Sequence, residues 1–289
     1  MNIRTKLLTI AALLAVWSCT EKDPTPVGPD SSDPIEFGSV STKALITGIN
    51  QVNEFGVSCA ISNADNSDYG SIMDNVKVFR DEESATGWNY NPKSYWLEDS
   101  HYYFVAAYPF VEGGGFELED EEINGVNIIS YNLNVDTYDE HNRDHIGEDI
   151  LAASEYVNTL DSWNNTVNFK LHHLLTNVNF EISQDMDSDP NNHYFITGIS
   201  LYGISTNGTY TTIAGDDNWI SYWTLETPVN DVSYDKAFDE YLLEEGDLSV
   251  WGEDGLLLLP QNIAREKVTL RIDYLYELDM TEDDQGNQN

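Results

Sequence analysis

The stretch Val167–Ile182, VNFKLHHLLTNVNFEI, lies just past the middle of the 289-residue chain and decides the fold class. Apolar and polar residues alternate over its first five positions and again over its last five. This period-two pattern is typical of half-buried β-strands. The residues between the two runs, His172 to Asn177, are too few for an independent helix and too many for a two-residue hairpin turn. We therefore predict two strands joined by a short connector, and an all-β protein.

The same pattern recurs along the rest of the chain, where apolar runs are separated by turn-forming clusters such as SNADNSDYG and EGGG. The run Tyr102–Tyr108, YYFVAAY, is almost continuously apolar, which predicts a strand buried on both faces. The charged run Glu117–Glu122 is expected to be a solvated loop, and Ile150–Ala153 a helical turn. Lys236–Gly246 has the most helix-like pattern. The other strand-like runs are Ala44–Ile49, Glu54–Ile61, Val76–Phe79, Ile128–Val135, Tyr194–Tyr202, Gly208–Ile213, Ile220–Leu225, Leu256–Leu259 and Val268–Tyr276.

The composition is strongly acidic, with 51 acidic and 13 basic residues and a formal net charge of −38. Such a surface repels nucleic-acid phosphates and anionic lipid head groups, so any tie to a membrane must be covalent or apolar. Hydrophobic residues make up 40% of the chain, which is enough to build a core. Many short strands, little helix and no repeat of about 20 to 50 residues predict two β-sandwich domains in series.

The N-terminus has the features of a bacterial lipoprotein leader. Arg4 and Lys6 precede the apolar run Leu7–Val16, whose 10 residues are too short to span a bilayer. The run ends in Val-Trp-Ser-Cys, which resembles a lipobox with its cysteine at Cys19. We predict that residues 1–18 are a signal peptide, that cleavage occurs before Cys19, and that acylation of Cys19 attaches the chain to a membrane.

After the leader, the chain is predicted to consist of a tether and two domains. Residues 19–34 are rich in Pro, Asp and Ser and are expected to be a flexible tether. With Cys19 acylated, Cys59 has no disulfide partner, and its alternating apolar surroundings predict a small core residue. We place an N-terminal β-sandwich domain at residues 35–160 and a C-terminal one at residues 161–289, with a disordered polar tail.

Candidate catalytic motifs are lacking, since the sequence has no phosphate-binding glycine loop, no GxSxG and no HExxH. His141 and His145 lie four residues apart in an acidic loop, but zinc requires three or four convergent ligands. His172 and His173 are adjacent on a predicted strand and would point to opposite faces. We therefore predict no enzyme activity, no cofactor and no metal site.

Two further clusters invite a binding function. Asp185, Asp187 and Asp189 have the alternate spacing of a calcium loop, but Pro190 occupies the glycine position, which favours a surface turn. Another cluster precedes the run at 102–108 and fits the rim of a sandwich core, although a carbohydrate platform is the alternative. Its members are the aromatic residues Trp88, Tyr90, Tyr95 and Trp96.

The order of several short motifs after the leader resembles the fimbrillin (Mfa-like) family of Bacteroidales fimbrial subunit lipoproteins. The resemblance covers roughly residues 35–276 and implies two transthyretin-like β-sandwich domains. It also implies export to the outer surface of the outer membrane and assembly into a fimbria. The motifs are STKA (41–44), MDNVKV (73–78), YYFVAAYP (102–109), DILAA (149–153), LHHLLTNVNFEI (171–182) and LLLPQ (257–261).

The resemblance also implies a way of assembly. In such pilins a protease removes the N-terminal segment, and a strand of the next subunit fills the vacated groove. The partners would be other fimbrial subunits, and the role would be adhesion through a receptor that the sequence does not identify. Processing in the best-known members is arginine-specific, and the matching position in STKA is Lys43, the candidate processing site here.

The resemblance leaves several points open. The family commonly ends in a C-terminal strand pair containing Trp and Tyr, whereas this chain ends in TEDDQGNQN, so the donor region is absent or the sequence is cut short. This favours a tip, anchor or accessory subunit over a stalk subunit. The VNFKLHHLLTNVNFEI segment is expected to open the C-terminal sandwich, with His173 packing and hydrogen-bonding. The alternative function is a surface lipoprotein that binds carbohydrate for glycan uptake.

Overall fold

The structure, a computed structural model of the whole chain, shows an almost entirely β-stranded protein. It contains no α-helix within the residues described, which confirms the predicted all-β fold class. In the same residues no helix is long and apolar enough to cross a membrane. The structure describes residues 33–42, 52–64, 69–123, 126–139, 141, 149–159, 166–184, 192–215, 218–229, 232–243, 247–252, 255–263 and 268–278.

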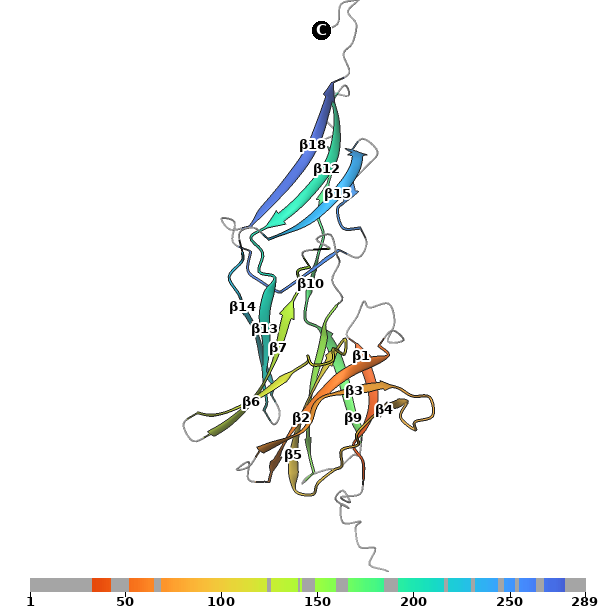
Figure 1. Cartoon of the computed structure of the whole chain (residues 1–289), viewed down its shortest axis with the longest axis vertical. Helices are drawn as coiled ribbons and strands as arrows, with labels where there is room; N and C mark the ends of the chain where they lie inside the picture. The colour runs from red at the N-terminus through yellow and green to blue at the C-terminus, as the bar shows by residue number, and fades with distance from the viewer. Residues whose placement is uncertain are drawn as a thin grey trace, which may run out of the picture.

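Seven strands form the largest sheet, in the order β1-β9-β8-β5-β2-β3-β4 (Figure 1). Neighbouring strands are antiparallel except β1 and β9, which are parallel. The sheet curls until its two ends approach, because Pro34 before β1 forms a bridge with Tyr95 after β4. The strands are β1 Glu36–Thr42, β2 Glu54–Asn63, β3 Tyr69–Arg80, β4 Trp88–Tyr90, β5 Ser100–Tyr108, β8 Leu151–Asn158 and β9 Thr166–His173.

The other strands form smaller sheets that extend the molecule along its long axis, with β12, β15 and β18 at the end away from the seven-stranded sheet (Figure 1). The four-stranded sheet has the order β14-β13-β7-β6, and the three-stranded sheet the order β15-β12-β18. Two short pairs, β10 with β17 and β11 with β16, complete the set. These strands are β6 Glu117–Ile123, β7 Val126–Asp136, β10 Thr176–Val178, β11 Glu181–Ile182, β12 Asn192–Tyr202, β13 Asn207–Ile213, β14 Ile220–Leu225, β15 Ser233–Leu242, β16 Leu248–Ser249, β17 Leu256–Leu258 and β18 Thr269–Leu278.

Three hydrophobic cores fill the molecule. The first lies inside the curled seven-stranded sheet, the second between that sheet and the four-stranded sheet, and the third beneath the three-stranded sheet. Strand β5 separates the first two, because Phe104 faces the first core while Tyr103 and Val105 face the second. All three side chains are buried, which confirms the prediction of a strand buried on both faces.

Several sequence-based expectations are wrong because pairing with distant strands overrides local pattern. The helix expected at Lys236–Gly246 is strand β15 as far as Leu242, where it pairs with β12. The loop expected at Glu117–Glu122 is β6, an edge strand in which the acidic side chains at 117, 119, 120 and 121 are exposed. The helical turn expected at Ile150–Ala153 is the start of β8.

The opening stretch contains the predicted strands, but they serve different sheets. Strand β9 pairs with β8 through Leu151↔His173 and with β1, whereas β10 and β11 pair with β17 and β16. The expectation that the whole stretch opens the C-terminal sandwich is therefore wrong for β9. Strands from both sides of residue 160 also share the four-stranded sheet, where Tyr210 pairs with Leu133. The domain limits themselves stay a prediction.

Candidate strand-exchange site

Strand β1 occupies the position at which the resemblance predicts strand exchange. It pairs with one strand only, β9, in a parallel register from Glu36↔Thr166 to Thr42↔Leu171. Its apolar residues nevertheless lie deep in the first core, where Ile35, just before the strand, and Phe37 are buried. The strand thus combines an edge position with side chains that the core requires.

The ring of Phe37 holds β1 in the first core. It stacks on Phe169 of β9 at 5.8 Å between centroids and 22° between planes. It also meets Tyr90 edge-on at 5.2 Å, and two more rings, Phe55 and Phe104, at 6.3 and 6.5 Å. Aromatic pairs favour such stacked and edge-to-face arrangements. Phe37 therefore fills a cage built by four strands of the same sheet.

A bulge in β1 follows Phe37 and depends on Gly38. The register between β1 and β9 shifts between Phe37 and Val40, and Gly38 lies within this shift. A Cβ atom at Gly38 would lie 2.4 Å from Thr166 Cγ2 and 2.5 Å from the Asn168 side-chain oxygen, so a larger residue would have to displace these side chains. The same oxygen accepts hydrogen bonds from the Ser39 N–H at 2.8 Å and the Ser39 hydroxyl at 3.0 Å.

The N-terminal end of β1 is tied to the segment after β4. The Ile35 N–H donates to the Ser94 carbonyl at 2.9 Å, and the Tyr90 hydroxyl donates to the Ile35 carbonyl at 2.9 Å. One residue pair further out, the Trp96 N–H donates to the Asp33 carbonyl at 3.1 Å. The segment that leads into β1 is therefore held by residues 94–96, which brings the two ends of the curled sheet together.

The two site residues predicted from sequence both lie outside the described residues. Lys43 directly follows Thr42, the last residue of β1, in the sequence. Cys19 precedes the first described residue, Asp33. The expected strand at Ala44–Ile49, His145 and the aspartates at 185–189 also fall outside the described ranges. Lipidation and cleavage therefore stay predictions.

The two histidines of the opening stretch have different neighbours. His173 Nδ1 forms a short hydrogen bond with Asp149 Oδ2, and both side chains are partly exposed. His172 lies 3.4 Å from the Tyr210 hydroxyl through its Nε2 atom. No group of three or more metal-ligating side chains occurs among the residues that the structure describes. His172 thus connects β9 with β13, and His173 connects β9 with the residue two positions before β8.

The aromatic cluster after β3 is part of the first core. Trp88, Tyr90 and Trp96 are buried, and only Tyr95 has a side chain that is half exposed. The outer face of Trp88 is covered by the Arg80 guanidinium, which lies 4.0 Å from the ring centroid. This confirms the interpretation as a core rim, and it leaves a single exposed ring for a carbohydrate.

Cys59 of β2 is also a core residue, as predicted. Its side chain is fully buried, and its thiol donates to the Ala60 carbonyl at 3.3 Å. Burial raises the pKa of the Cys59 thiol well above its usual value. Since the thiolate is the reactive form, this cysteine is inert.

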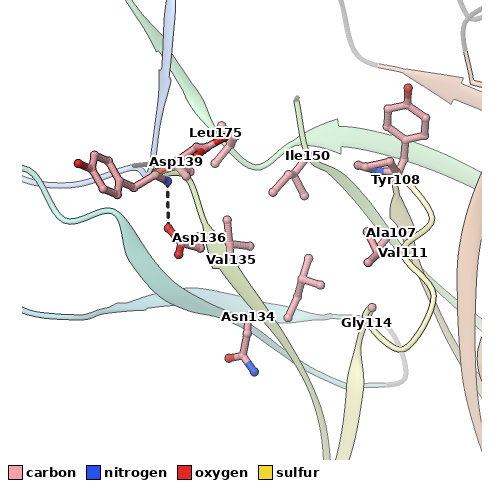
Figure 2. Close-up of a pocket in the computed structure, with 15 residues that line it drawn as sticks. Ala107, Tyr108, Val111, Gly114, Asn134, Val135, Asp136, Asp139, Ile150 and Leu175 are labelled. Carbon is pink, nitrogen blue, oxygen red and sulfur yellow. Dashed lines mark hydrogen bonds between the residues drawn. The ribbon is translucent and has the colours of Figure 1, made fainter. Parts of the chain in front are cut away.

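Figure 2 shows a pocket of about 350 Å³ between the end of β5, the loop after it and the end of β7. Ala107, Val135 and Ile150 give it a mainly apolar lining. The Asp136 carboxylate at its edge already accepts a hydrogen bond from the Tyr138 N–H at 2.9 Å, drawn as the dashed line. The pocket lies apart from β1, and we do not place strand exchange there.

The fold and the position of β1 can now be compared with known proteins. The model of the fimbrillin-like family matches residues 42–289, which is most of the chain. The chain belongs to this family. The match begins at the last residue of β1, so the strand that fills the first core precedes the matched region. A search of curated proteins finds no match.

Two solved structures are similar to this fimbrillin-like chain. A fimbrial protein from Bacteroides vulgatus aligns over 84% of this chain and 84% of its own, with a TM-score of 0.52 and 17% identity. A candidate cell adhesion protein from Bacteroides ovatus aligns over 85% of both chains, with a TM-score of 0.46 and 16% identity. At these identities the first likeness shows a shared fold, and the second carries no argument.

The contacts that hold the bulge of β1 were not predicted from the sequence. The side-chain contacts of Asn168 with the β1 bulge cross 129 residues of sequence, and Asn168 itself occupies an ordinary outward position of β9. The polar positions of an alternating strand give no signal for such a role. The glycine in IEFGSV is a local signal that could have indicated a close approach to a neighbouring strand.

Proposed function

We propose that this fimbrillin-like chain is a structural subunit of a bacterial surface fimbria, assembled by strand exchange at the β1 position and serving adhesion. One observation carries the proposal. Strand β1 pairs with a single neighbour, fills the first core with Phe37, and runs directly into Lys43. A cut after Lys43 would free the strand together with everything N-terminal to it.

Removal of β1 would leave a site that demands another strand. The backbone groups of β9 that face β1 would lose their partners, and the cage around Phe37 would open. Unpaired backbone groups beside an apolar groove favour the addition of a strand from another chain. A donor with apolar side chains at the spacing of Ile35, Phe37 and Val40 would restore both the hydrogen bonds and the core.

The position of the strand also fits a lipid-anchored subunit. On this proposal Cys19 carries the lipid that holds the chain on the outer surface of the outer membrane. The 16 residues between Cys19 and Glu36 could extend about 55 Å. Cleavage after Lys43 would separate the folded part from this anchor and would open the acceptor groove in the same step. The chain acts as an assembly component and not as an enzyme.

Limited proteolysis tests the proposal. The purified full chain is treated with a trypsin-like protease and run on a denaturing gel without boiling. We expect loss of the segment up to Lys43, followed by a ladder of oligomers that collapses to monomer on boiling. Other fimbrial subunits can be added as donors where this chain does not complement itself.

Lys22 provides a matched control, because a cut there removes part of the tether and leaves β1 in place. The Lys43→Ala variant should still be cut at Lys22 and should stay monomeric. Cleaved wild-type chain that remains monomeric, with and without donor subunits, would contradict the proposed assembly.

A further inference from the structure

Strand β18 carries the largest group of exposed apolar side chains in the described part of the molecule. It forms the edge of the three-stranded sheet and pairs only with β12. Its side chains are between 37% and 56% exposed at the six large apolar positions. An uncovered edge strand of this kind pairs readily with another chain. The six residues are Leu270, Ile272, Tyr274, Leu275, Tyr276 and Leu278.

Most of this apolar surface lies on the core side of the sheet. Paired residues of antiparallel strands point to the same face, and Ile272 is paired with Ile199 while Leu270 is paired with Leu201. Ile199 and Leu201 are buried in the third core. The third core therefore continues onto β18 as a strip of exposed apolar side chains, and the opposite face of β18 carries the charges.

We propose that β18 pairs with β18 of a second copy of this chain, antiparallel and about a twofold axis at Tyr274. In this register Tyr274 lies opposite its own counterpart, Ile272 opposite Tyr276, and Leu270 opposite Leu278. The nine residues from Leu270 to Leu278 all find a partner, so the strands overlap almost completely. The pairing joins two three-stranded sheets into one of six strands with a continuous apolar face.

The charges of β18 fit this register and disfavour the axes at Asp273 and Leu275. On the polar face it places Arg271 opposite Glu277 twice, once on each side of the axis, and Asp273 opposite Leu275. A twofold axis at Asp273 would place that carboxylate against itself, and an axis at Leu275 would place Asp273 against Glu277. Like charges directly opposite each other destabilise a strand pair, whereas opposite charges stabilise it. Registers shifted by one residue would set the apolar strip against the charges.

The side chains involved are available for this pairing. Arg271 contacts Asp273 of its own strand, with Nη2 to Oδ1 at 2.8 Å, and both side chains are exposed. A glutamate of the second copy would lie beside the same guanidinium. The net charge of −38 opposes association of two copies, but at physiological salt repulsion is screened beyond about 8 Å. The contact therefore depends on the local pairs along β18.

This inference does not rest on the proposed function. The three-stranded sheet lies at the end of the molecule away from the seven-stranded sheet that contains β1, so pairing through β18 requires no release of β1 (Figure 1). All tests use the full chain without protease, in which strand exchange at β1 cannot begin. Failure of the β18 pairing would therefore leave strand exchange at β1 to be tested separately, and failure of strand exchange would leave the β18 pairing to be tested separately.

Cysteine crosslinking measures the register. Residues directly opposite each other across the axis are within disulfide reach. The Tyr274→Cys chain should form a covalent dimer under mild oxidation, seen on a non-reducing gel. The Ile272→Cys chain should not crosslink alone, but a mixture with Tyr276→Cys should give a dimer. The wild-type chain, with Cys59 buried, sets the background from its natural cysteines.

A charge exchange tests the polar face. Arg271→Glu should weaken the dimer roughly tenfold in sedimentation, because both symmetry-related pairs change from attraction to repulsion. The double variant Arg271→Glu with Glu277→Arg should restore it. Tyr274→Cys chains that stay monomeric, or Ile272→Cys chains that crosslink equally well alone, would overturn the proposal. A strand from another subunit on β18 would give the first of these results.

Discussion

Replacing Phe37 by alanine should destabilise the chain by about 4 kcal/mol. The ring is 2% exposed and contacts four other aromatic rings. Removing a buried phenylalanine costs about 3–5 kcal/mol, since the transfer free energy of the ring is lost and a cavity remains. The bulge at Gly38 and its contact with Asn168 fix the backbone, so the cavity cannot collapse by a shift of β1.

Urea unfolding followed by tryptophan fluorescence measures this cost. For an m-value of about 2–3 kcal/mol per M, the midpoint should fall by about 1.3–2 M urea. Trp88 and Trp96 are buried in the same core and report its opening. The matched control is Val40→Ala on the same strand, which removes less volume and should cost about half as much.

A loss below about 1 kcal/mol for Phe37→Ala would refute the reasoning, because it would mean that the core closes without the ring. The same variant links packing to processing. A weaker hold on β1 should expose the chain around Lys43, so cleavage there should accelerate relative to wild type, while cleavage at Lys22 should keep its rate.

Three further changes probe other parts of the fold. Burial raises the pKa of Tyr90, Tyr102 and Tyr234 to about 12, from the usual 10. The stability that these neutral tyrosines contribute is therefore full below pH 10 and is lost as the pH rises toward 12, which urea midpoints across that window should show. Tyr131→Phe should cost about 2–3 kcal/mol in the same assay, because its hydroxyl donates to the Tyr103 carbonyl at 2.6 Å and accepts from a β2 N–H at 2.7 Å. Gly38→Ala should cost at least about 1 kcal/mol because its Cβ would meet the Asn168 side chain.

Strands with a clear local pattern were predictable from the sequence. The run Ile220–Leu225 has the same bounds as β14, and Glu54–Ile61 and Tyr102–Tyr108 fall within β2 and β5. Alternation and β-branched or aromatic residues mark such strands because one or both faces are buried. Strands β6 and β15 lack that mark, since acidic side chains occupy many positions and pairing with β7 and β12 decides their conformation.

The arrangement of the candidate site was less predictable than its elements. The histidine pair is the most conspicuous feature of the β9 sequence. The candidate site depends instead on the parallel pairing of β9 with β1. The contact joins residues about 130 apart in sequence, and nothing local in IEFGSVST or VNFKL specifies a parallel partner. The family resemblance predicts an exchanged strand. The structure shows how β1 packs in the first core and pairs with β9.

The position of β5 has a mechanical consequence. One face of β5 packs in the first core and the other face in the second core. Displacing β5 to open either core would therefore also expose the other core to solvent. Tension transmitted through the subunit would therefore meet a single cooperative block over this part of the molecule. Stretching one molecule should rupture the two cores in one force peak. Within a filament, each such subunit would have no weak joint between its first and second cores.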